Sequence, residues 1–433
     1  MKNKRQRRRV RTQYMITAGL GLAVTFIFII QAVLPRTNNG TTSTSVPTSQ
    51  SDVGITPEPT SLRAPTLESG IPQITVLDSH LNSTGLFQFF QPGDDWYMER
   101  DDYNTDYRRA STVYISPSRL SVIHAFVEIG TNYPSLQAIS DTVLTDVYFN
   151  TEWGQYKSWR YTNRQVTDSL ITIDFALEDD RNELLKYIGR QISWLENDWL
   201  YTVRIVVPDN NPVLLDRLFE LSMPTMVGYH NIGVFPLLGW KEFSDQSQRM
   251  MIKLQEVWTQ IGGSSGRPIT YAGATLTEGY EVTIQRIPGQ PLESLEAAQT
   301  WLSNFRIGIQ IVEGRPTTQT FAQGYWFSYT YNTVEGDPVS AAASLLNDTD
   351  GNLYFAELRT PERDANFLAT DLTEQRLIGQ QIIESFTVLA PIGYSIVPGT
   401  TGQQPAQPSE ATTQEAATPE SDTAPEATAP FGG

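Results

Sequence analysis

Apolar residues are most concentrated near the start of the chain, in a predominantly apolar segment at residues 14–34. This segment has 21 residues and no charged side chain. As a helix rising about 1.5 Å per residue, it would match a bilayer hydrocarbon core of about 30 Å. Seven Lys and Arg residues precede it within residues 1–13, and basic flanks favour the cytoplasmic side. The pattern predicts an uncleaved transmembrane signal-anchor at 14–34, a basic cytoplasmic tail at 1–13 and an extracytoplasmic remainder. A cleaved signal peptide is the alternative, although its apolar core usually has only about 7–15 residues.

The apolar pattern disappears in two segments that flank a patterned middle region. Residues 35–72 are rich in Ser, Thr and Pro, and residues 393–433 contain five acidic residues and no Lys or Arg. Such compositions cannot bury a hydrophobic core. We therefore expect a disordered stalk at 35–72 and a disordered acidic tail at 393–433.

Between these segments, strand-like and helix-like patterns occur twice in the same order. Residues 121–129 and 281–287 alternate polar and apolar side chains, as half-buried strands do. A segment with helical spacing follows each of them. The apolar positions on one face of these predicted helices are Leu136, Ile139, Val143 and Val147 in the first, and Leu295, Ala298, Trp301, Leu302 and Phe305 in the second.

Further strands and a final helix complete each copy. The predicted strands are 170–176 and 199–208 in the first copy, and 324–331, 339–346 and 353–361 in the second. Apolar residues at 214–219 and at 378–386 mark the final helices. The repeated order predicts two tandem domains, at residues 73–228 and 229–392.

Each copy is also expected to open with a short apolar strand, a proline turn and a tryptophan. The strands are 85–90 and 231–235, and the turns are Pro92…Trp96 and Pro236-Leu-Leu-Gly-Trp240. With the strand Trp-Leu-Tyr-Thr-Val at 199–203, these turns resemble the PsbP-like family, the extrinsic subunit of the oxygen-evolving complex and its bacterial relatives. The resemblance implies an α+β fold of two tandem α/β/α sandwich domains, each an antiparallel sheet flanked by helices. It also implies a binding or assembly role without catalytic residues. The membrane anchor and the tandem arrangement depart from the family's pattern.

Charge and composition narrow the range of functions. The net charge of the whole chain is −17, and residues 73–391 alone contain 40 acidic and 22 basic residues. This negative excess argues against nucleic acid and anionic lipid headgroups as partners. The chain has no Cys and three His, which excludes disulfides and thiolate metal sites.

Two loops match catalytic or metal-binding patterns in part. Gly262-Gly-Ser264-Ser-Gly266 has the letters of a nucleophile elbow, but that motif needs a helix after it. Both flanks are strand-like here, which favours a hairpin loop. Asp348, Asp350 and Glu357 occupy three positions of a calcium loop, whereas Leu346 stands where the first carboxylate should be. An Asp-Gly hairpin turn is the favoured interpretation, and calcium binding by these three residues stays open.

Isolated polar and aromatic residues are expected to be structural. His124 lies on the strand face opposite Ile123, Ala125 and Val127, and a lone strand histidine is usually structural. The tryptophans of the predicted strands, expected mainly to fill cores with ligand stacking as the minority alternative, are Trp194, Trp199 and Trp326. The acidic pairs expected to be solvated are Asp94-Asp95, Asp101-Asp102 and Asp179-Asp180.

These features favour a membrane-tethered extracytoplasmic binding or adaptor protein without catalytic activity. It would sit in the cell membrane through a single span, with a protein partner or small ligand, and with no cofactor, metal or catalytic residue. A cell-envelope hydrolase using loop carboxylates is the alternative, and a purely structural envelope spacer is a third interpretation.

Overall fold

The computed structural model describes residues 79–90, 92–93, 95–180, 185–306, 308–391 and 394. The predicted cytoplasmic tail, transmembrane helix and stalk lie outside the described residues, as does the predicted acidic tail apart from Tyr394. Within the described ranges, no helix combines the length and apolar character needed to cross a bilayer.

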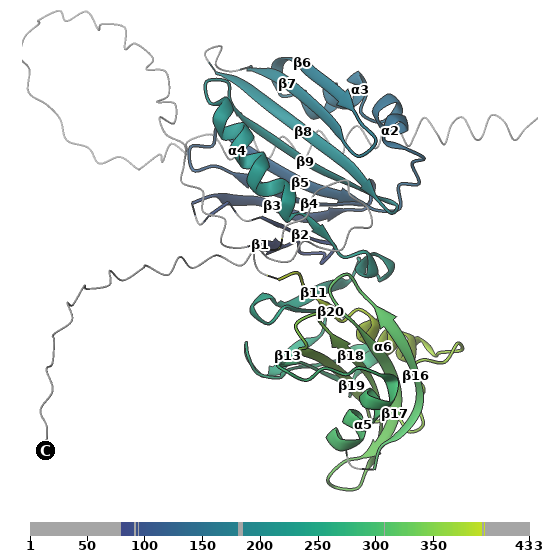
Figure 1. Ribbon diagram of the computed structural model, residues 1–433. Helices are drawn as coiled ribbons and strands as arrows, with labels where there is room; N and C mark the ends of the chain where they lie inside the picture. The colour runs from purple at the N-terminus through teal and green to yellow at the C-terminus, as the bar shows by residue number, and fades with distance from the viewer. Residues whose placement is uncertain are drawn as a thin grey trace, which may run out of the picture.

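Two large antiparallel sheets form the body of the protein (Figure 1). The strands of the first are β3 (Tyr97–Asn104), β4 (Arg109–Ile115), β5 (Val122–Glu128), β6 (Tyr156–Val166), β7 (Ile171–Asp179), β8 (Lys186–Glu196) and β9 (Trp199–Pro208). The strands of the second are β13 (Thr259–Gly262), β14 (Ile269–Ala272), β15 (Glu281–Ile287), β16 (Gln310–Thr318), β17 (Gln323–Asn332), β18 (Pro338–Asn347) and β19 (Leu353–Thr360). Their spatial orders are β3-β4-β5-β9-β8-β7-β6 and β13-β14-β15-β19-β18-β17-β16. The two orders correspond strand by strand.

A three-stranded sheet accompanies each large sheet. The first contains β1 (Ser79–Leu81), β2 (Phe87–Phe90) and β10 (Val227–Gly228), and the second contains β11 (Trp240–Asp245), β12 (Met250–Gln255) and β20 (Thr387–Val388). In both small sheets, the first two strands come from the start of the unit and the third strand comes from its end, and the second of the three lies in the middle. The described chain therefore consists of two units with the same topology, as the repeated sequence pattern predicts.

Helices cover both faces of each large sheet. They are α2 (Leu136–Thr142), α3 (Asp146–Glu152) and α4 (Pro212–Ser222) in the first unit, and α5 (Leu295–Phe305) and α6 (Glu374–Glu384) in the second. Short 3-10 turns are η1 (Met223–Thr225), η2 (His230–Val234), η3 (Gln246–Gln248) and η4 (Thr275–Thr277). In the first unit, Phe149 of α3 packs on Phe175 of β7, whereas Leu218 of α4 shares a separate core with Val203 of β9. The α+β class predicted from the sequence is confirmed.

The predicted helix from Leu136 to Val147 is interrupted. α2 ends at Thr142, and α3 begins at Asp146 after Thr145 in extended conformation. The acidic Asp146 in the first turn favours a new helix start, because the helix dipole is positive there. Val147 is consequently 75% exposed rather than part of the apolar face.

The predicted opening of the second unit is wrong. Residues 231–235 are not a strand, because η2 occupies most of them, and Trp240 begins β11 of the small sheet. Trp258, immediately before β13, holds the place that Trp96 holds immediately before β3. The turn ending in Trp240 is therefore not equivalent to the turn ending in Trp96. Of the observations behind the PsbP-like resemblance, this one fails.

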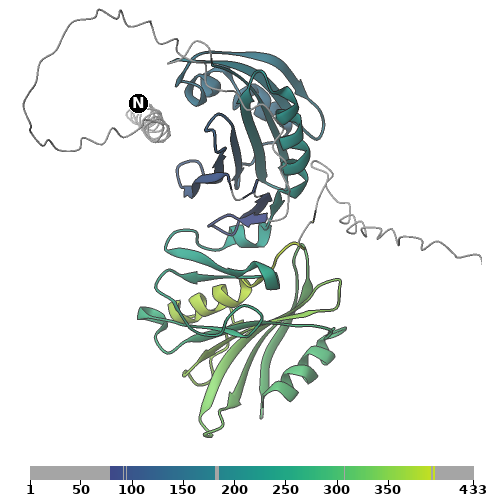
Figure 2. The ribbon, with the colours of Figure 1, turned by 90° about the vertical axis from the view of Figure 1, so that its left-hand side faces the viewer.

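The two units lie one above the other and meet through their small sheets (Figure 2). Tyr229, fully buried, connects them: its hydroxyl donates to Gln88 Oε1 of β2 at 2.7 Å and accepts from the Ala390 N–H at 3.0 Å. One continuous core cluster contains Leu86 of the first unit and Met251 of the second. The segment from Tyr229 to Gly239, which we call the connector, runs along this contact.

Candidate functional site

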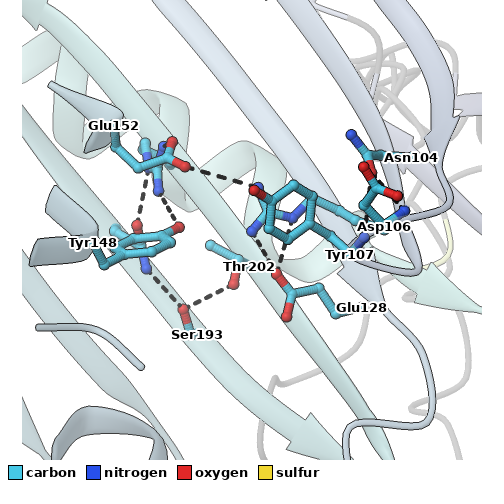
Figure 3. A network of polar contacts seen from close by, with 11 residues as sticks. Asn104, Asp106, Tyr107, Glu128, Tyr148, Glu152, Ser193 and Thr202 are labelled. Atoms are coloured by element: carbon cyan, nitrogen blue, oxygen red, sulfur yellow. Dashed lines mark hydrogen bonds and ion pairs between the residues drawn. The ribbon is translucent and has the colours of Figure 1, made fainter. Parts of the chain in front are cut away.

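A buried polar cluster lies on the helix α2–α3 side of the first sheet (Figure 3). Its centre is Arg204 of β9, which stands opposite His124 of β5 and Gln191 of β8 in the ladder. Arg204 donates to Glu152 of α3 at 2.5 Å, to Gln191 Oε1 at 2.9 Å and to the Tyr148 hydroxyl at 2.7 Å. Each of the three guanidinium nitrogens thus has a hydrogen-bond partner inside the unit.

A second ion pair extends the cluster toward the strand ends. Arg109 of β4 donates from Nε to Glu128 of β5 at 2.9 Å, and its Nη1 lies 3.9 Å from Glu152. Figure 3 shows Glu128 and Glu152 on either side of this link. Arginines and glutamates therefore alternate, and the cluster carries no net charge.

Burial and neighbouring charges fix the protonation states of the cluster. Burial, supported by the cations of Arg204 and Arg109, lowers the pKa of His124 well below its usual value. Burial alone would raise the pKa of Glu152, but Arg204 and Arg109 together lower it below its ordinary value. His124 is therefore neutral and Glu152 ionised at neutral pH. A neutral buried histidine among satisfied ion pairs agrees with the structural role expected for His124.

The second unit has a smaller buried cluster on the corresponding face of its sheet. Glu357 of β19 accepts from Arg306, which follows α5, through both carboxylate oxygens, one of them at 3.0 Å. The Tyr329 hydroxyl donates to the same carboxylate at 2.5 Å. The Glu357 side chain is only 1% exposed, so this pair also connects a sheet to its covering helix.

The titratable groups that come from both units meet at the contact between the small sheets. His80 Nε2 of β1 lies 2.9 Å from Asp101 Oδ2 of β3. Glu242 of β11 comes close to the first unit, because its Cβ lies next to Gly85. The charges of Asp101 and His80 both act on the pKa of Glu242. Lys253 of β12 stands opposite Glu242 in the strand register. We call these four residues, His80, Asp101, Glu242 and Lys253, the junction cluster.

The junction cluster is less completely paired than the two clusters beneath the helices. Lys253 is 1% exposed, and its Nζ donates to the Pro236 carbonyl of the connector at 3.4 Å. Burial lowers its pKa to about 8, although Glu242 acts in the opposite direction. Burial, reinforced by Asp101, raises the pKa of Glu242 to about 7. Within the described residues, neither side chain forms an ion pair within 4 Å, which distinguishes this site from the others.

Exposed aliphatic side chains lie on the connector next to this cluster. Val234 is 79% exposed and Leu238 is 71% exposed, two residues on either side of Pro236. The Glu256 N–H donates to the Gly239 carbonyl at 3.0 Å, which brings Val257, 47% exposed, close to Leu238. Apolar surface and incompletely paired buried charge are therefore adjacent here.

The residues of the calcium-loop pattern do not gather at one point. Asp348 accepts from Arg249 and from Tyr354, whose ring belongs to the α6-side core. Glu357 instead lies on the α5 side, bound by Arg306. The two carboxylates face opposite sides of the sheet and cannot hold one ion. The segment forms the β18–β19 hairpin turn, as favoured from the sequence, and no group of three potential metal ligands occurs among the residues described.

Most other sequence candidates are also structural. Gly262–Gly266 lies in the β13–β14 hairpin, as predicted. Trp194 and Trp199 are buried, and Trp326 is half-buried against Arg315. Asp95, Asp102 and Asp180 are exposed as expected, Asp179 is half-buried, and Asp94 lies outside the described residues.

Asp101 is a correction to the expectation of solvated acidic pairs. Its carboxylate is bound by His80, Asn82 and Thr112, and its side chain is only 13% exposed. Alternation explains the difference from Asp102, because neighbouring residues of a strand point to opposite faces.

Sequence reasoning missed Arg204 and Lys253, and it considered Glu357 only as a calcium ligand and Asp101 only as a solvated carboxylate. Arg204 and Lys253 each stand inside an otherwise apolar strand, Trp-Leu-Tyr-Thr-Val-Arg-Ile-Val-Val and Met-Met-Ile-Lys-Leu. A charge in such a run is costly unless it is paired, so both were detectable. Glu152, which pairs with Arg204, and Glu242, which stands opposite Lys253 in the strand register, lie in polar stretches of sequence and carried no such signal.

The fold and these clusters define a protein of two tandem α+β units. No family model and no curated protein matches the chain. Among solved structures it is similar to cyanobacterial PsbP from Synechocystis sp. PCC 6803, with 14% identity, a TM-score of 0.26, and coverage of 35% of this chain and 94% of that one. It is also similar to the type VI secretion immunity protein TplEi of Pseudomonas aeruginosa, with 11% identity, a TM-score of 0.20, and coverage of 72% of this chain and 97% of that one. A second structure of TplEi, complexed with a peptide named "L", has 10% identity, a TM-score of 0.19, and coverage of 68% and 98%.

Proposed function

We propose that this chain is a membrane-tethered, extracytoplasmic binding or adaptor protein that recognises a partner at the junction between its two units. The observation that carries the proposal is the adjacency of the junction cluster and the exposed connector. Buried charge that is incompletely paired and exposed aliphatic side chains occur together there. Ligand and partner sites form preferentially at contacts between domains.

The other two polar clusters support the same choice of site. Arg204 and Glu357 are bound by partners from their own units, so both clusters brace helices against sheets. At the junction, by contrast, Glu242 and Lys253 lie between elements of different units and approach the connector. A partner that contributes hydrogen-bonding groups there would complete their pairing.

The tether is inferred from the sequence of residues 1–72. A basic segment, a 21-residue apolar segment and a Ser/Thr/Pro-rich stalk precede the first unit. Such an arrangement holds the two units away from the cytoplasmic side of a membrane. The two α/β/α units, related to PsbP-like domains in this proposal, then present the junction to the envelope.

A pull-down of the full chain from native membranes tests this proposal. The chain should enrich a partner, and Leu238→Asp should reduce that enrichment at least about tenfold, because a charge on the apolar connector costs binding energy. Val334→Asp is the matched control, since Val334 is fully exposed on the β17–β18 turn of the second unit. Equal enrichment by both variants, or no specific partner at all, contradicts the proposal.

One observation favours an envelope hydrolase as a second candidate. Burial, reinforced by the charge of Asp101, raises the pKa of Glu242 to about 7, and a carboxyl with such a pKa can act as a general acid at neutral pH. Turnover of chromogenic glycoside and ester substrates by the full chain, lost at least about 100-fold in Glu242→Gln, would support this role. Absence of turnover, or turnover unchanged by the substitution, argues against it.

A further inference from the structure

The buried ion pairs of the two units occupy the same topological position. Arg204 stands opposite His124, and Glu357 stands opposite Thr283, in corresponding strand pairs of the two sheets. His124 and Thr283 both lie twelve residues before the first residue of the covering helix, Leu136 or Leu295. Arg204 and Glu357 likewise both lie four residues before a proline that ends or follows the strand. The two positions are therefore equivalent.

The polarity of the two pairs is opposite. In the first unit the sheet provides the cation, Arg204, and the helical connection provides the anion, Glu152. In the second unit the sheet provides the anion, Glu357, and the residue after the helix provides the cation, Arg306. The sheet residues are 3% and 1% exposed at their side chains, so water screens neither of them effectively.

Units of the same topology in one chain can exchange elements during folding. The segment between β5 and β6 and the segment between β15 and β16 both pack helices on the same face of equivalent sheets. Tethering keeps each segment at high effective concentration near the other sheet. Misassembly between similar neighbouring domains is a recognised failure of tandem proteins.

We propose that the reversed ion pairs act as a recognition code that makes each helical connection pack only on its own sheet. If the α2–α3 connection covered the second sheet, Glu152 would meet Glu357. If α5 covered the first sheet, Arg306 would meet Arg204. Each hybrid replaces a buried ion pair with two like charges, which is strongly unfavourable, whereas the native arrangement pairs opposite charges.

Changing the polarity of one unit at a time tests the code. Arg306→Glu with Glu357→Arg gives both units the polarity of the first, and Glu152→Arg with Arg204→Glu gives both the polarity of the second. Each double variant keeps opposite charges within every unit but permits hybrids. The quadruple variant reverses both units and forbids hybrids again.

Disulfide trapping measures the hybrids directly, since the chain has no cysteine of its own. A background carrying Ala138→Cys in α2 and Ala343→Cys in β18 is refolded as the full chain under oxidising conditions, and the disulfide-linked fraction is measured within and between chains. Both double variants should raise this fraction at least about tenfold over the two-cysteine background, equivalent to about 1.4 kcal/mol. The quadruple variant should return it close to the background value.

The quadruple variant distinguishes an effect of charge polarity on the hybrid fraction from an effect of disturbed packing around the substituted residues. It combines every disturbance of the neighbours Tyr148, Gln191 and Tyr329, so damage alone would make it the worst of the three variants. If it traps the most hybrid, or if the double variants trap no more than the background, the proposal is overturned. Arg306→Gln with Glu357→Gln, which removes charge without adding any, covers the case in which a reversed variant does not fold. It should raise the hybrid fraction by a smaller factor, and no rise would also overturn the proposal.

Discussion

At the scale of the residue, this protein places charged side chains in positions that are wholly or partly shielded from water. Arg204 and Glu357 are compensated within their own units, by Glu152 and by Arg306. Glu242 and Lys253 are compensated less directly, and burial shifts the pKa of each toward its neutral form. The ion pairs of Arg204 and Glu357 stabilise the fold of each unit. Glu242 and Lys253 make the contact between the units sensitive to pH.

Removal of Arg204 should be among the most destabilising single changes in the first unit. Arg204→Ala leaves Glu152 buried without its main partner, and we expect the free energy of unfolding to fall by about 3–5 kcal/mol. Arg217→Ala is the matched control, because Arg217 and Glu220 form an exposed pair on α4 whose loss should cost less than about 1 kcal/mol. Urea denaturation of the three proteins measures the difference. Equal losses would show that the buried cluster does not brace the unit.

Glu242 should make stability depend on pH. The pKa of this carboxyl is raised from 4.5 to about 7 in the folded protein. Its contribution to the free energy of unfolding is therefore fully present below pH 4.5, the pKa in the unfolded chain, and is lost as the pH rises through 7. Burial is the main cause of the raised pKa; the hydrogen bond with Ser244 opposes it, Asp101 reinforces it, and His80 and Lys241 oppose it. We expect the loss to be about 1–3 kcal/mol because the side chain is partly exposed. Glu242→Gln should remove the pH dependence between pH 5 and pH 8. Lys253 acts in a separate window, because its lowered pKa makes stability rise from about pH 8 upward.

Denaturant titration at half-unit pH steps measures this effect. Parallel pH profiles for the wild-type protein and Glu242→Gln would contradict the assignment of a raised pKa to this carboxyl.

At the scale of the element, sheet strands were the most predictable part of the chain. β5, β9, β15 and β19 follow the predicted ranges within about two residues, because their apolar positions alternate or form continuous buried runs. The division of the first helical segment at residues 143–145 and the 3-10 turn at 230–234 were not predictable in the same way. Short apolar segments fit a strand or a turn equally well, and tertiary packing decides between them.

The candidate sites were less predictable than the strands, for a physical reason. Arg204 and Lys253 are conspicuous as charges in apolar strands, but the carboxylates nearest to them in the structure come from a helix, for Arg204, and from the adjacent strand of the same small sheet, for Lys253. Asp101 and Asp102 are adjacent and chemically identical in sequence, yet only Asp101 faces Asn82 and His80. Such pairing depends on sheet register, which the composition of a segment does not determine.

Close packing between strands should appear at Gly189 of β8. A Cβ added there would lie 2.2 Å from the Phe175 ring and 2.9 Å from the Ile205 carbonyl oxygen. We expect Gly189→Ala to lower the free energy of unfolding by about 1–3 kcal/mol through overpacking. Gly262→Ala in β13 is the control, since a Cβ there meets nothing within 4 Å, and its effect should be within about 0.5 kcal/mol. Thermal unfolding of the two variants is sufficient, and equal midpoints would contradict the packing described for β7, β8 and β9.

At the scale of the whole molecule, two units of one topology are joined by a buried tyrosine and a partly exposed connector. The Tyr229 hydroxyl forms hydrogen bonds with Gln88 of the first unit and with the backbone of Ala390 at the end of the second unit. This contact, together with the core that continues through both small sheets, fixes the connector beside the junction cluster. The proposed binding function depends on this placement rather than on either unit alone.

Site-specific photocrosslinking from the connector tests that central claim most directly. A photoreactive amino acid replaces Leu238 in one full-length chain and Val334 in another, and both are irradiated in native membranes. The account predicts a discrete crosslinked partner from position 238 and none from position 334, since only the first lies beside the junction cluster. Crosslinks of equal yield and identity from both positions, or none from position 238, would contradict it.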